Sequence, residues 1–419
     1  MKKSFLFVFL FIIIFLCIIY FKNSTSFFVK KEDSTKNIDS FQTININDYY
    51  NEYVITNKDS DIYIYDNNSF YKIGVISSGV ELSLGGIIDN YFIINSLDDT
   101  YYIKYEDVNK IDTLSSYDDR YKKYILFNQD IITDNNTSFY NENNELVLTF
   151  NKSYKLPILI KKEDRYGVLF NEKLYYVLKK DVRVIDSNNS SDTNTKGISV
   201  LNYHFFYDDT IEKERISCNQ SICEPLSKFK EQLKYIKDNN FFTPTLEELE
   251  MYIDGDIQLP KSVIITIDDG WRANQGIDLL EEYKLNGVLF LITAWYNPNN
   301  YKNNYIEIAS HGDNLHNNGV CYGGQGGAIK CMSHDKLLED LKKSRYKLNN
   351  TKYFCYPFYE YNDYSIKVLK EAGYSMAFGG EYENGYKYVK PGIDKFRLPR
   401  WVIVNYTEMN TFKQYLNLG

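Results

Sequence analysis

The stretch SVIITIDDGW, residues 262–271, decides the fold of the C-terminal half of this chain. Its apolar and hydroxyl residues predict a β-strand covered on both faces, as in parallel α/β sheets and barrels. Such strands carry their chemistry at their carboxyl ends, where Asp268 and Asp269 stand side by side. Because consecutive strand residues point to opposite sides, we expect two roles, one metal ligand and one base. An ordinary surface turn at Asp-Gly is the alternative interpretation.

Strands and amphipathic helices alternate around this stretch, from residue 198 to the end of the chain. The helix over 245–253 opens with a capping box formed by Thr245 and Glu248. About seven βα steps predict an α/β fold, a distorted (β/α)7 barrel. The predicted strands are 198–206, 262–269, 287–295, 305–310, 352–357, 374–379 and 400–405, and the predicted helices are 227–240, 245–253, 276–287, 333–348 and 363–373, with one more at the C-terminus.

Three of the four histidines fall at the same predicted rim as the carboxylate pair. His204 ends one strand, His311 ends another, and His316 follows five residues later in the loop. Two imidazoles and a carboxylate from another strand form a facial triad that binds a divalent metal and leaves positions open for water and substrate. A histidine taken singly is more often structural or solvated, and this interpretation is preferred for His334, near the start of a helix.

Five motifs occur in order over residues 198–419, namely LNYHFF (201–206), TIDDGW (266–271), SHGDNLH (310–316), YPFYEYN (356–362) and RLPRWVI (397–403). Together they resemble the polysaccharide deacetylase family, also called the NodB-homology or carbohydrate esterase 4 family. The histidine motif and the early Tyr-His pair are most similar to the poly-N-acetylglucosamine deacetylase branch, whose catalytic-acid histidine is moved to the start of the domain. No histidine follows His334, so His204 is the acid that the resemblance implies.

The resemblance implies metal-dependent hydrolysis of an acetamide, with zinc as the expected ion and cobalt, nickel or manganese as alternatives. The metal would polarise the carbonyl and lower the pKa of its bound water, while a base takes the proton of that water and an imidazolium protonates the departing amine. The implied residues are Asp268 as base, His204 as acid, Asp269, His311 and His316 as metal ligands, Tyr356, Pro357 and Phe358 at the oxyanion site, and Arg397 or Arg400 as the arginine that orients the base.

Three residues depart from the family pattern. Gly312 stands where the family usually has Ser or Thr, Tyr359 replaces the glycine usual after the Pro-aromatic pair, and Phe354 stands where an arginine is common. None of these changes removes a ligand, the base or the acid. The chain is therefore expected to be catalytic rather than a degenerate binding protein.

The N-terminal stretch MKKSFLFVFLFIIIFLCIIYFK, residues 1–22, predicts a transmembrane signal-anchor. Its uncharged run over 4–21 spans roughly 27 Å as a helix, enough to cross a bilayer. No small-x-small cleavage site follows, and a cleaved signal peptide is the alternative. Lys2 and Lys3 precede the span, which predicts a single-pass protein of the cell membrane with an extracellular catalytic domain. The polar residues 23–55 predict a stalk.

Short strand-like runs over residues 56–188 predict an all-β region. Residues 70–112 and 153–186 share an opening Tyr-Lys, a central strand, a double-Tyr strand and a closing acidic-Val step, which indicates a duplicated unit. By pattern the region resembles tandem bacterial SH3-like barrels. Its role stays open between carbohydrate or cell-wall binding and a spacer. Residues 189–197 are the predicted polar linker to the deacetylase domain, 198–419.

Charge and cysteines restrict the partners and the compartment. A net charge of -8 and a pI near 5.3 argue against nucleic acid as a partner. In an exported protein, Cys218 with Cys223 and Cys321 with Cys331 are expected to form short-loop disulfides, which leaves Cys355 unpaired.

The sequence therefore predicts a membrane-anchored, extracellular N-deacetylase acting on N-acetylglucosamine residues of a glycan, with a poly-N-acetylglucosamine exopolysaccharide favoured. Peptidoglycan deacetylation and glycan O-acetyl esterase activity are the alternatives within the enzyme class. A non-catalytic cell-wall-binding protein is the alternative outside it. The predicted partners are the glycan, the membrane through the N-terminal helix, and the cell wall through the β region.

Overall fold

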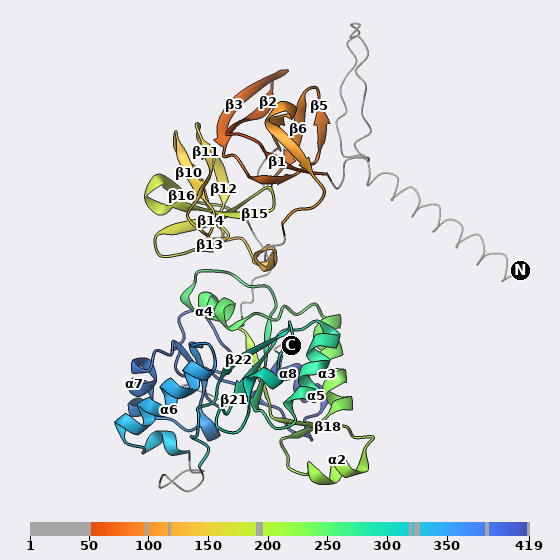
Figure 1. The fold of residues 1–419 in the computed structure, drawn as a ribbon, viewed down its shortest axis with the longest axis vertical. Helices are drawn as coiled ribbons and strands as arrows, with labels where there is room; N and C mark the ends of the chain where they lie inside the picture. Colours follow the sequence, from red (N-terminus) through yellow and green to blue (C-terminus); the bar gives the residue numbers. More distant parts are fainter. Residues whose placement is uncertain are drawn as a thin grey trace, which may run out of the picture. The chain divides into compact units, whose positions relative to one another are not determined.

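The computed structural model describes residues 52–96, 100–115, 119–189, 196–317, 321, 327–381 and 385–416, which belong to one compact unit (Figure 1). They form an all-β region followed by a mixed α/β region. Among these residues, no helix combines the length and the apolar composition that crossing a membrane requires. The predicted anchor, residues 1–22, nearly all of the predicted stalk, 23–55, and most of the predicted linker, 189–197, lie outside the described residues.

The all-β region contains two units with the same topology. The order β4-β1-β8 in the first unit corresponds to β12-β9-β16 in the second, and β5-β6-β7-β2-β3 corresponds to β13-β14-β15-β10-β11. Pairing of β3 with β11 joins the units in one ten-stranded sheet. The strands are β1 (Tyr53–Thr56), β2 (Ser60–Asp66), β3 (Ser69–Ile76), β4 (Glu81–Ser83), β5 (Gly86–Ile88), β6 (Tyr91–Asn95), β7 (Thr100–Lys104), β8 (Val108–Ile111), β9 (Gln129–Thr133), β10 (Thr137–Tyr140), β11 (Leu146–Phe150), β12 (Lys155–Pro157), β13 (Ile160–Lys161), β14 (Arg165–Phe170), β15 (Lys173–Leu178) and β16 (Val182–Asp186).

This topology confirms the duplication and corrects how the copies align. The double-Tyr strands are β7 and β15, and the closing steps are β8 and β16, which are equivalent positions. The opening Tyr-Lys pairs are not equivalent, because Lys72 lies in β3 and Lys155 begins β12, which corresponds to β4. A Tyr-Lys dipeptide is a weak marker in a chain with 40 tyrosines, so it aligned two unrelated strands.

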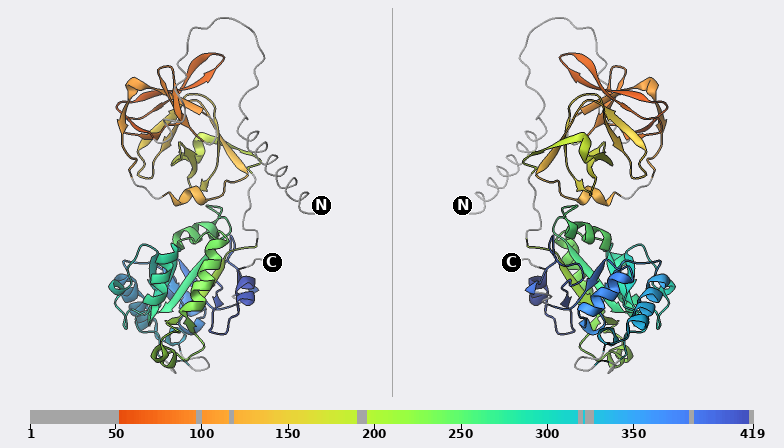
Figure 2. Two further views of the ribbon diagram at one scale, coloured as in Figure 1. Left: turned by 90° about the vertical axis from the view of Figure 1, so that its right-hand side faces the viewer. Right: turned by 90° about the vertical axis from the view of Figure 1, so that its left-hand side faces the viewer.

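The α/β region is built around seven parallel strands, with the helices outside the curled sheet (Figure 2). Its strands are β17 (Ser199–Tyr203), β18 (Phe205–Tyr207), β19 (Cys223–Pro225), β20 (Val263–Asp269), β21 (Gly287–Leu291), β22 (Ile306–Ser310), β23 (Tyr353–Cys355), β24 (Met376–Phe378) and β25 (Trp401–Val402). Its helices are α2 (Glu212–Ser217), α3 (Leu226–Asp238), α4 (Leu246–Asp254), α5 (Ala273–Tyr283), α6 (His334–Lys347), α7 (Asp363–Glu371) and α8 (Met409–Tyr415).

The parallel sheet has the order β24-β23-β22-β21-β20-β17-β25, and its two ends approach each other. Ala377 and Leu398 are joined by a backbone hydrogen bond, and Phe378 forms a parallel bridge with Leu398, just before β25. The sheet therefore curls toward the predicted seven-stranded barrel. It is less regular than that prediction, because the β21–β22 connection has only a short 3₁₀ helix, Pro298–Asn300, in place of an α-helix.

Strand β20 is buried along its length because both of its faces are covered. Ile264 packs in one apolar cluster with Val288 and Phe290 of β21. Ile265 packs in another cluster, which contains residues of α3 and α5 such as Leu233. This alternation predicts that Asp268 ends the row of even-numbered positions, on the inner side with Ile264.

Contacts within the compact unit join the β region to the α/β region. Thr245 and Glu248 form the predicted capping box of α4, so that expectation is confirmed. The same Glu248 side chain forms an ion pair with Arg120 and accepts a hydrogen bond from Tyr124 at 3.0 Å. Ile160 forms a backbone bridge with Ile257.

Candidate active site

Polar residues gather at the carboxyl ends of neighbouring strands of the parallel sheet. Asp268 and Asp269 end β20, His311 directly follows β22, and His204 directly follows β17. In the sheet, β17 pairs with β20, and β21 separates β20 from β22. Because the strands are parallel, their carboxyl ends face the same edge. The structure thus brings together the residues that the sequence placed at one rim.

Asp269, His311 and His316 form a cluster with the geometry of a metal site. Oδ1 of Asp269 lies 3.4 Å from Nε2 of His311 and 3.3 Å from Nε2 of His316. One donor atom from each residue lies within 4.8 Å of the others. Nδ1 of His311 lies 2.8 Å from the backbone carbonyl of Cys355, which can only accept a hydrogen bond, so Nε2 is left as the ligand atom.

Electrostatics prepare His316 as a neutral ligand. Burial, followed by the charge of His311, lowers the pKa of His316 to about 3, which leaves its imidazole uncharged at neutral pH. Burial alone would raise the pKa of Asp269, but its hydrogen bond with His311 and the charges of the histidines hold the pKa below the usual range. Burial alone would lower the pKa of His311, but its contacts with Cys355 and Asp269 raise the pKa well above the usual range. Metal binding therefore finds Asp269 and His316 in the required form and displaces a proton from His311.

The loop that carries His311 and His316 is fixed by two carboxylates. The buried Asp313 accepts a hydrogen bond from Thr293 at 2.7 Å and forms an ion pair with Lys343 at 2.6 Å. Asp340 of α6 accepts from the backbone N–H groups of Asp313 and Asn314, each at 2.8 Å. Motif spacing did not point to Asp340, because its contact with Asp313 spans 27 residues of sequence. Asp313 belongs to the quoted SHGDNLH motif, but the sequence analysis gave it no role.

Asp268 lies on the other side of the pleat, against a buried arginine. Its side chain accepts a hydrogen bond from Nη1 of Arg400 at 2.8 Å, and both side chains are at most 2% exposed. Nε of Arg400 also donates to the carbonyl of Gly379 at 2.9 Å. Burial alone would raise the pKa of Asp268, but the charges of Arg400, His311 and His204 outweigh it and hold the pKa well below the usual range. Asp268 is therefore ionised and oriented.

Of the two arginines that the sequence left open, only Arg400 contacts Asp268. Arg397 instead forms ion pairs with Asp363 and Asp394, whose side chains are exposed. The thiol of Cys355, which the sequence analysis did not assign, lies 3.5 Å from Oδ2 of Asp268.

His204 lies at the same rim with one ring nitrogen engaged. Its Nε2 lies 3.5 Å from the hydroxyl of Tyr359. Its Nδ1 is buried and has no hydrogen-bond partner among the described residues. Burial lowers the pKa of His204, while the charges of Asp268 and Asp269 act in the opposite direction.

The predicted oxyanion segment surrounds a sharp backbone turn. Tyr356 is fully buried, where its ring stacks on Tyr361 and its hydroxyl donates to the carbonyl of Phe396 at 3.0 Å. Pro357 is also buried and begins a 3₁₀ helix, Pro357–Tyr359. Phe358 is partly exposed, has φ of 57° and places its ring 5.1 Å from that of His316. Only Phe358 of the three predicted residues thus borders the metal-ligand cluster with its side chain.

The family comparison covers the central part of this arrangement. Residues 256–377 match the model of the family described as polysaccharide deacetylase. The matched segment contains Asp268, the cluster of Asp269, His311 and His316, and the Tyr-Pro-Phe turn. His204 and Arg400 lie outside the matched segment. The catalytic and metal-binding roles of all the predicted residues stay predictions.

Known proteins resemble the chain over different lengths. A Bacillus subtilis (strain 168) protein named as a polysaccharide deacetylase, YxkH, is 23% identical over 167 residues, which cover 38% of this chain and 60% of that protein. A de-N-acetylase from Aggregatibacter actinomycetemcomitans is 21% identical, covering 52% of this chain and 99% of that one, with a TM-score of 0.43. IcaB from Ammonifex degensii is 20% identical, covering 54% and 99%, with a TM-score of 0.43.

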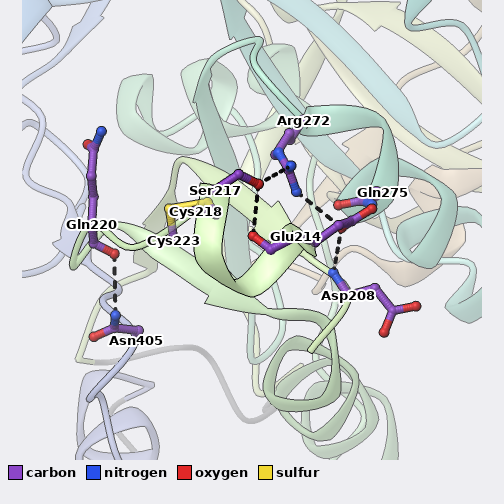
Figure 3. The surroundings of a disulfide bond; sticks show 9 residues. All are labelled: Asp208, Glu214, Ser217, Cys218, Gln220, Cys223, Arg272, Gln275 and Asn405. Atoms are coloured by element: carbon purple, nitrogen blue, oxygen red, sulfur yellow. Dashed lines mark hydrogen bonds and ion pairs between the residues drawn. A yellow bond between two sulfur atoms is a disulfide. The ribbon is translucent and has the colours of Figure 1, made fainter. Parts of the chain in front are cut away.

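A disulfide-closed segment after His204 is tied to the loop that follows β20 (Figure 3). Cys218 and Cys223 are bonded, as are Cys321 and Cys331, so both expected pairs are confirmed, and Cys355 is free and buried. Glu214 of α2 forms an ion pair at 3.1 Å with Arg272, which lies three residues after Asp269 (Figure 3). This contact holds the segment against the loop that follows β20.

Proposed function

We propose that this protein is a metal-dependent N-deacetylase that removes acetyl groups from N-acetylglucosamine residues of an extracellular glycan. The observation that carries the proposal is the cluster of Asp269, His311 and His316 beside the buried carboxylate of Asp268. Hydrolysis of an acetamide needs these two parts, a site for an electrophilic ion and a general base.

The donor set fits a divalent ion. One carboxylate oxygen and two imidazole nitrogens are a usual ligand set for a catalytic zinc, and cobalt, nickel and manganese accept the same donors. The hydrogen bond from Nδ1 of His311 to the Cys355 carbonyl supports the assignment, because such bonds orient ligand histidines. An ion held here would polarise the amide carbonyl and lower the pKa of a nearby water.

The protein's own groups would move the protons. Asp268, held ionised by Arg400, takes a proton from the attacking water. His204, at the neighbouring strand end, gives a proton to the departing amine when its imidazole is charged. The backbone N–H of Phe358 is proposed to bind the oxygen on which negative charge develops.

The substrate is proposed from the motif order and from one exposed side chain. The permuted histidine favours a poly-N-acetylglucosamine exopolysaccharide. Trp295 is 52% exposed, and its ring lies 5.9 Å from that of His316. An exposed indole beside the ligand cluster is suited to packing against the apolar face of a sugar ring.

Two other enzyme activities would use the same groups. Peptidoglycan carries N-acetylglucosamine as well, and an O-acetyl ester passes through a similar tetrahedral intermediate. A non-catalytic wall-binding protein that attaches through the SH3-like units is the alternative of another class. The buried base and the convergent ligand cluster favour catalysis over this alternative.

For the compartment, we retain a single-pass anchor with the catalytic domain outside the cell. The two disulfides suit an oxidising compartment. Protease treatment of intact cells tests this proposal. Loss of the C-terminal region without lysis supports it, and protection until lysis contradicts it.

The deciding experiment measures acetate release by the full chain from β-1,6-linked poly-N-acetylglucosamine and from peptidoglycan, with and without added zinc. Release from the first polymer, lost on chelation and restored by zinc, is the expected result. Release from peptidoglycan alone would shift the substrate to the alternative. Full activity of Asp268→Asn would refute the base, and full activity of His204→Ala would refute the acid.

A further inference from the structure

Tyr359 occupies a backbone position that normally favours glycine. Its φ is 60°, in the left-handed region, where a residue with a side chain is strained. The opposite residue is Gly380, whose added Cβ would lie 3.3 Å from Cβ of Tyr359. The chain therefore accommodates a bulky residue in a strained position, and strain of this kind is concentrated at functional sites.

The hydroxyl of Tyr359 has a fixed direction of hydrogen bonding. Nδ2 of the fully buried Asn202 lies 3.2 Å from the carbonyl of Tyr203, to which it can only donate. The amide oxygen of Asn202 therefore faces Tyr359, 2.7 Å from its hydroxyl, and accepts the hydroxyl proton. Since this proton is used, the Tyr359 oxygen can only accept a hydrogen from its next neighbour, Nε2 of His204, at 3.5 Å.

Among the described residues, the hydroxyl of Tyr359 is the polar group that restrains the ring of His204. Nδ1 of His204 is buried without a hydrogen-bond partner among them, although the residue as a whole is partly exposed. Contacts of catalytic groups are often long before substrate binds, so 3.5 Å is compatible with a bond that tightens in the complex.

We propose that Tyr359 is a positioning residue for His204: its hydroxyl accepts Nε2–H, which fixes the orientation of the ring and the tautomer of its neutral form. The inference rests on the proposed function in one respect, the role of His204 as acid. It extends that function, because the resembled family has glycine at this position and offers no hydroxyl there.

Several charged neighbours change the pKa of His204 and thus the stability of its charged form. Asp268 and Asp269 of β20 favour it, whereas Arg400 and His311 oppose it. The Tyr359 oxygen adds an acceptor for the imidazolium, so its removal lowers the pKa of His204 further. Because the acid must be charged to act, the alkaline limb of the rate profile then moves to lower pH.

The kinetic test uses Tyr359→Phe, which removes only the hydroxyl. The expected result is a roughly tenfold fall in kcat, with KM changed by less than about twofold and the alkaline limb at lower pH. Tyr364→Phe is the matched control. Tyr364 lies on α7, and the variant removes its hydroxyl, which donates to the carbonyl of Met332 at 2.9 Å. The control is expected to retain kcat and the pH profile. An unshifted alkaline limb in Tyr359→Phe overturns the proposal.

A spectroscopic test separates the contact from catalysis. With four histidines in the chain, side-chain ¹⁵N NMR of the zinc-loaded protein resolves the His204 tautomer, and His204→Ala assigns its signal. We expect protonated Nε2 in the wild type and a mixture of tautomers in Tyr359→Phe. Asn202→Ala frees the tyrosine proton and is expected to favour protonated Nδ1.

An unchanged tautomer in both variants refutes the contact. If His204→Ala keeps full activity while the tautomer shifts as expected, the acid assignment fails and the contact stands. If His204→Ala retains a measurable fraction of the activity, adding Tyr359→Phe is expected to cause no further loss, and a further loss contradicts action through His204.

Discussion

Removing the guanidinium of Arg400 is the sharpest test of how this site is built. In Arg400→Met, the carboxylate of Asp268 stays buried without its partner at 2.8 Å. Both side chains are at most 2% exposed, so solvent does not screen the loss. Breaking a fully buried ion pair costs about 3–5 kcal/mol of the free energy of unfolding. We expect this destabilisation at neutral pH.

The free energy of the Asp268–Arg400 ion pair also predicts how stability and kcat/KM depend on pH. One pKa unit corresponds to about 1.4 kcal/mol, so a loss of roughly 3 kcal/mol raises the pKa of Asp268 by about two units. In the unfolded chain the pKa of Asp268 is about 4. Because the pKa is lower in the folded protein, Asp268 stabilises the fold above this pH, and the stabilisation is lost as the pH falls toward the folded-state pKa. The difference in stability between wild type and variant is therefore largest near pH 7 and shrinks in acid. The acidic limb of kcat/KM moves to higher pH, because the base must be ionised.

Urea unfolding at several pH values and the pH profile of acetate release measure the two effects. Arg397→Met is the matched control, since Arg397 pairs only with exposed carboxylates among the described residues and should change stability by less than about 1 kcal/mol. Adding Asp268→Asn to Arg400→Met is expected to recover stability, because the unpaired charge is gone. A pH-independent loss of stability, with an unmoved acidic limb, would refute the proposed electrostatic role.

The remaining predictions concern the ligand cluster and its support. His316→Ala should abolish both stoichiometric zinc binding, by calorimetry, and acetate release; retained binding of one zinc per chain would exclude His316 as a ligand. Asp313→Asn should weaken zinc binding about 10–100-fold, because the buried carboxylate fixes the histidine loop, and an unchanged Kd would contradict this. Thr245→Ala should lower the free energy of unfolding by about 1 kcal/mol with activity retained, and no loss would refute its capping role.

The strands and their catalytic ends could be predicted because each has a local signature. The run before Asp268 is apolar on both sides of the pleat, and the structure covers both of its faces. His311 and His316 could be grouped with Asp269 because carboxyl ends of parallel strands meet at one edge. Periodicity and spacing were sufficient for this level of description.

The supporting contacts depend on tertiary structure and had no such signature. Arg397 and Arg400 are three residues apart in an irregular segment, and only the closure of the sheet places one of them against Asp268. Strand β25 is two residues long and exists through its pairing with β17. Asp340 and Asn202 act through contacts that cross 26 and 157 residues of sequence, respectively.

The two adjacent carboxylates have different partners because the backbone changes direction between them. Asp268 ends the regular pleat and points inward to Arg400, whereas Asp269 has φ of 72°, outside the strand region. Gly270 continues the turn with φ of 122°, and a Cβ there would lie 2.7 Å from Leu291. The sequence Asp-Asp-Gly is therefore a requirement of the geometry. Its first carboxylate needs the pleat, its second needs the left-handed turn toward the histidines, and its third position needs the absence of a side chain.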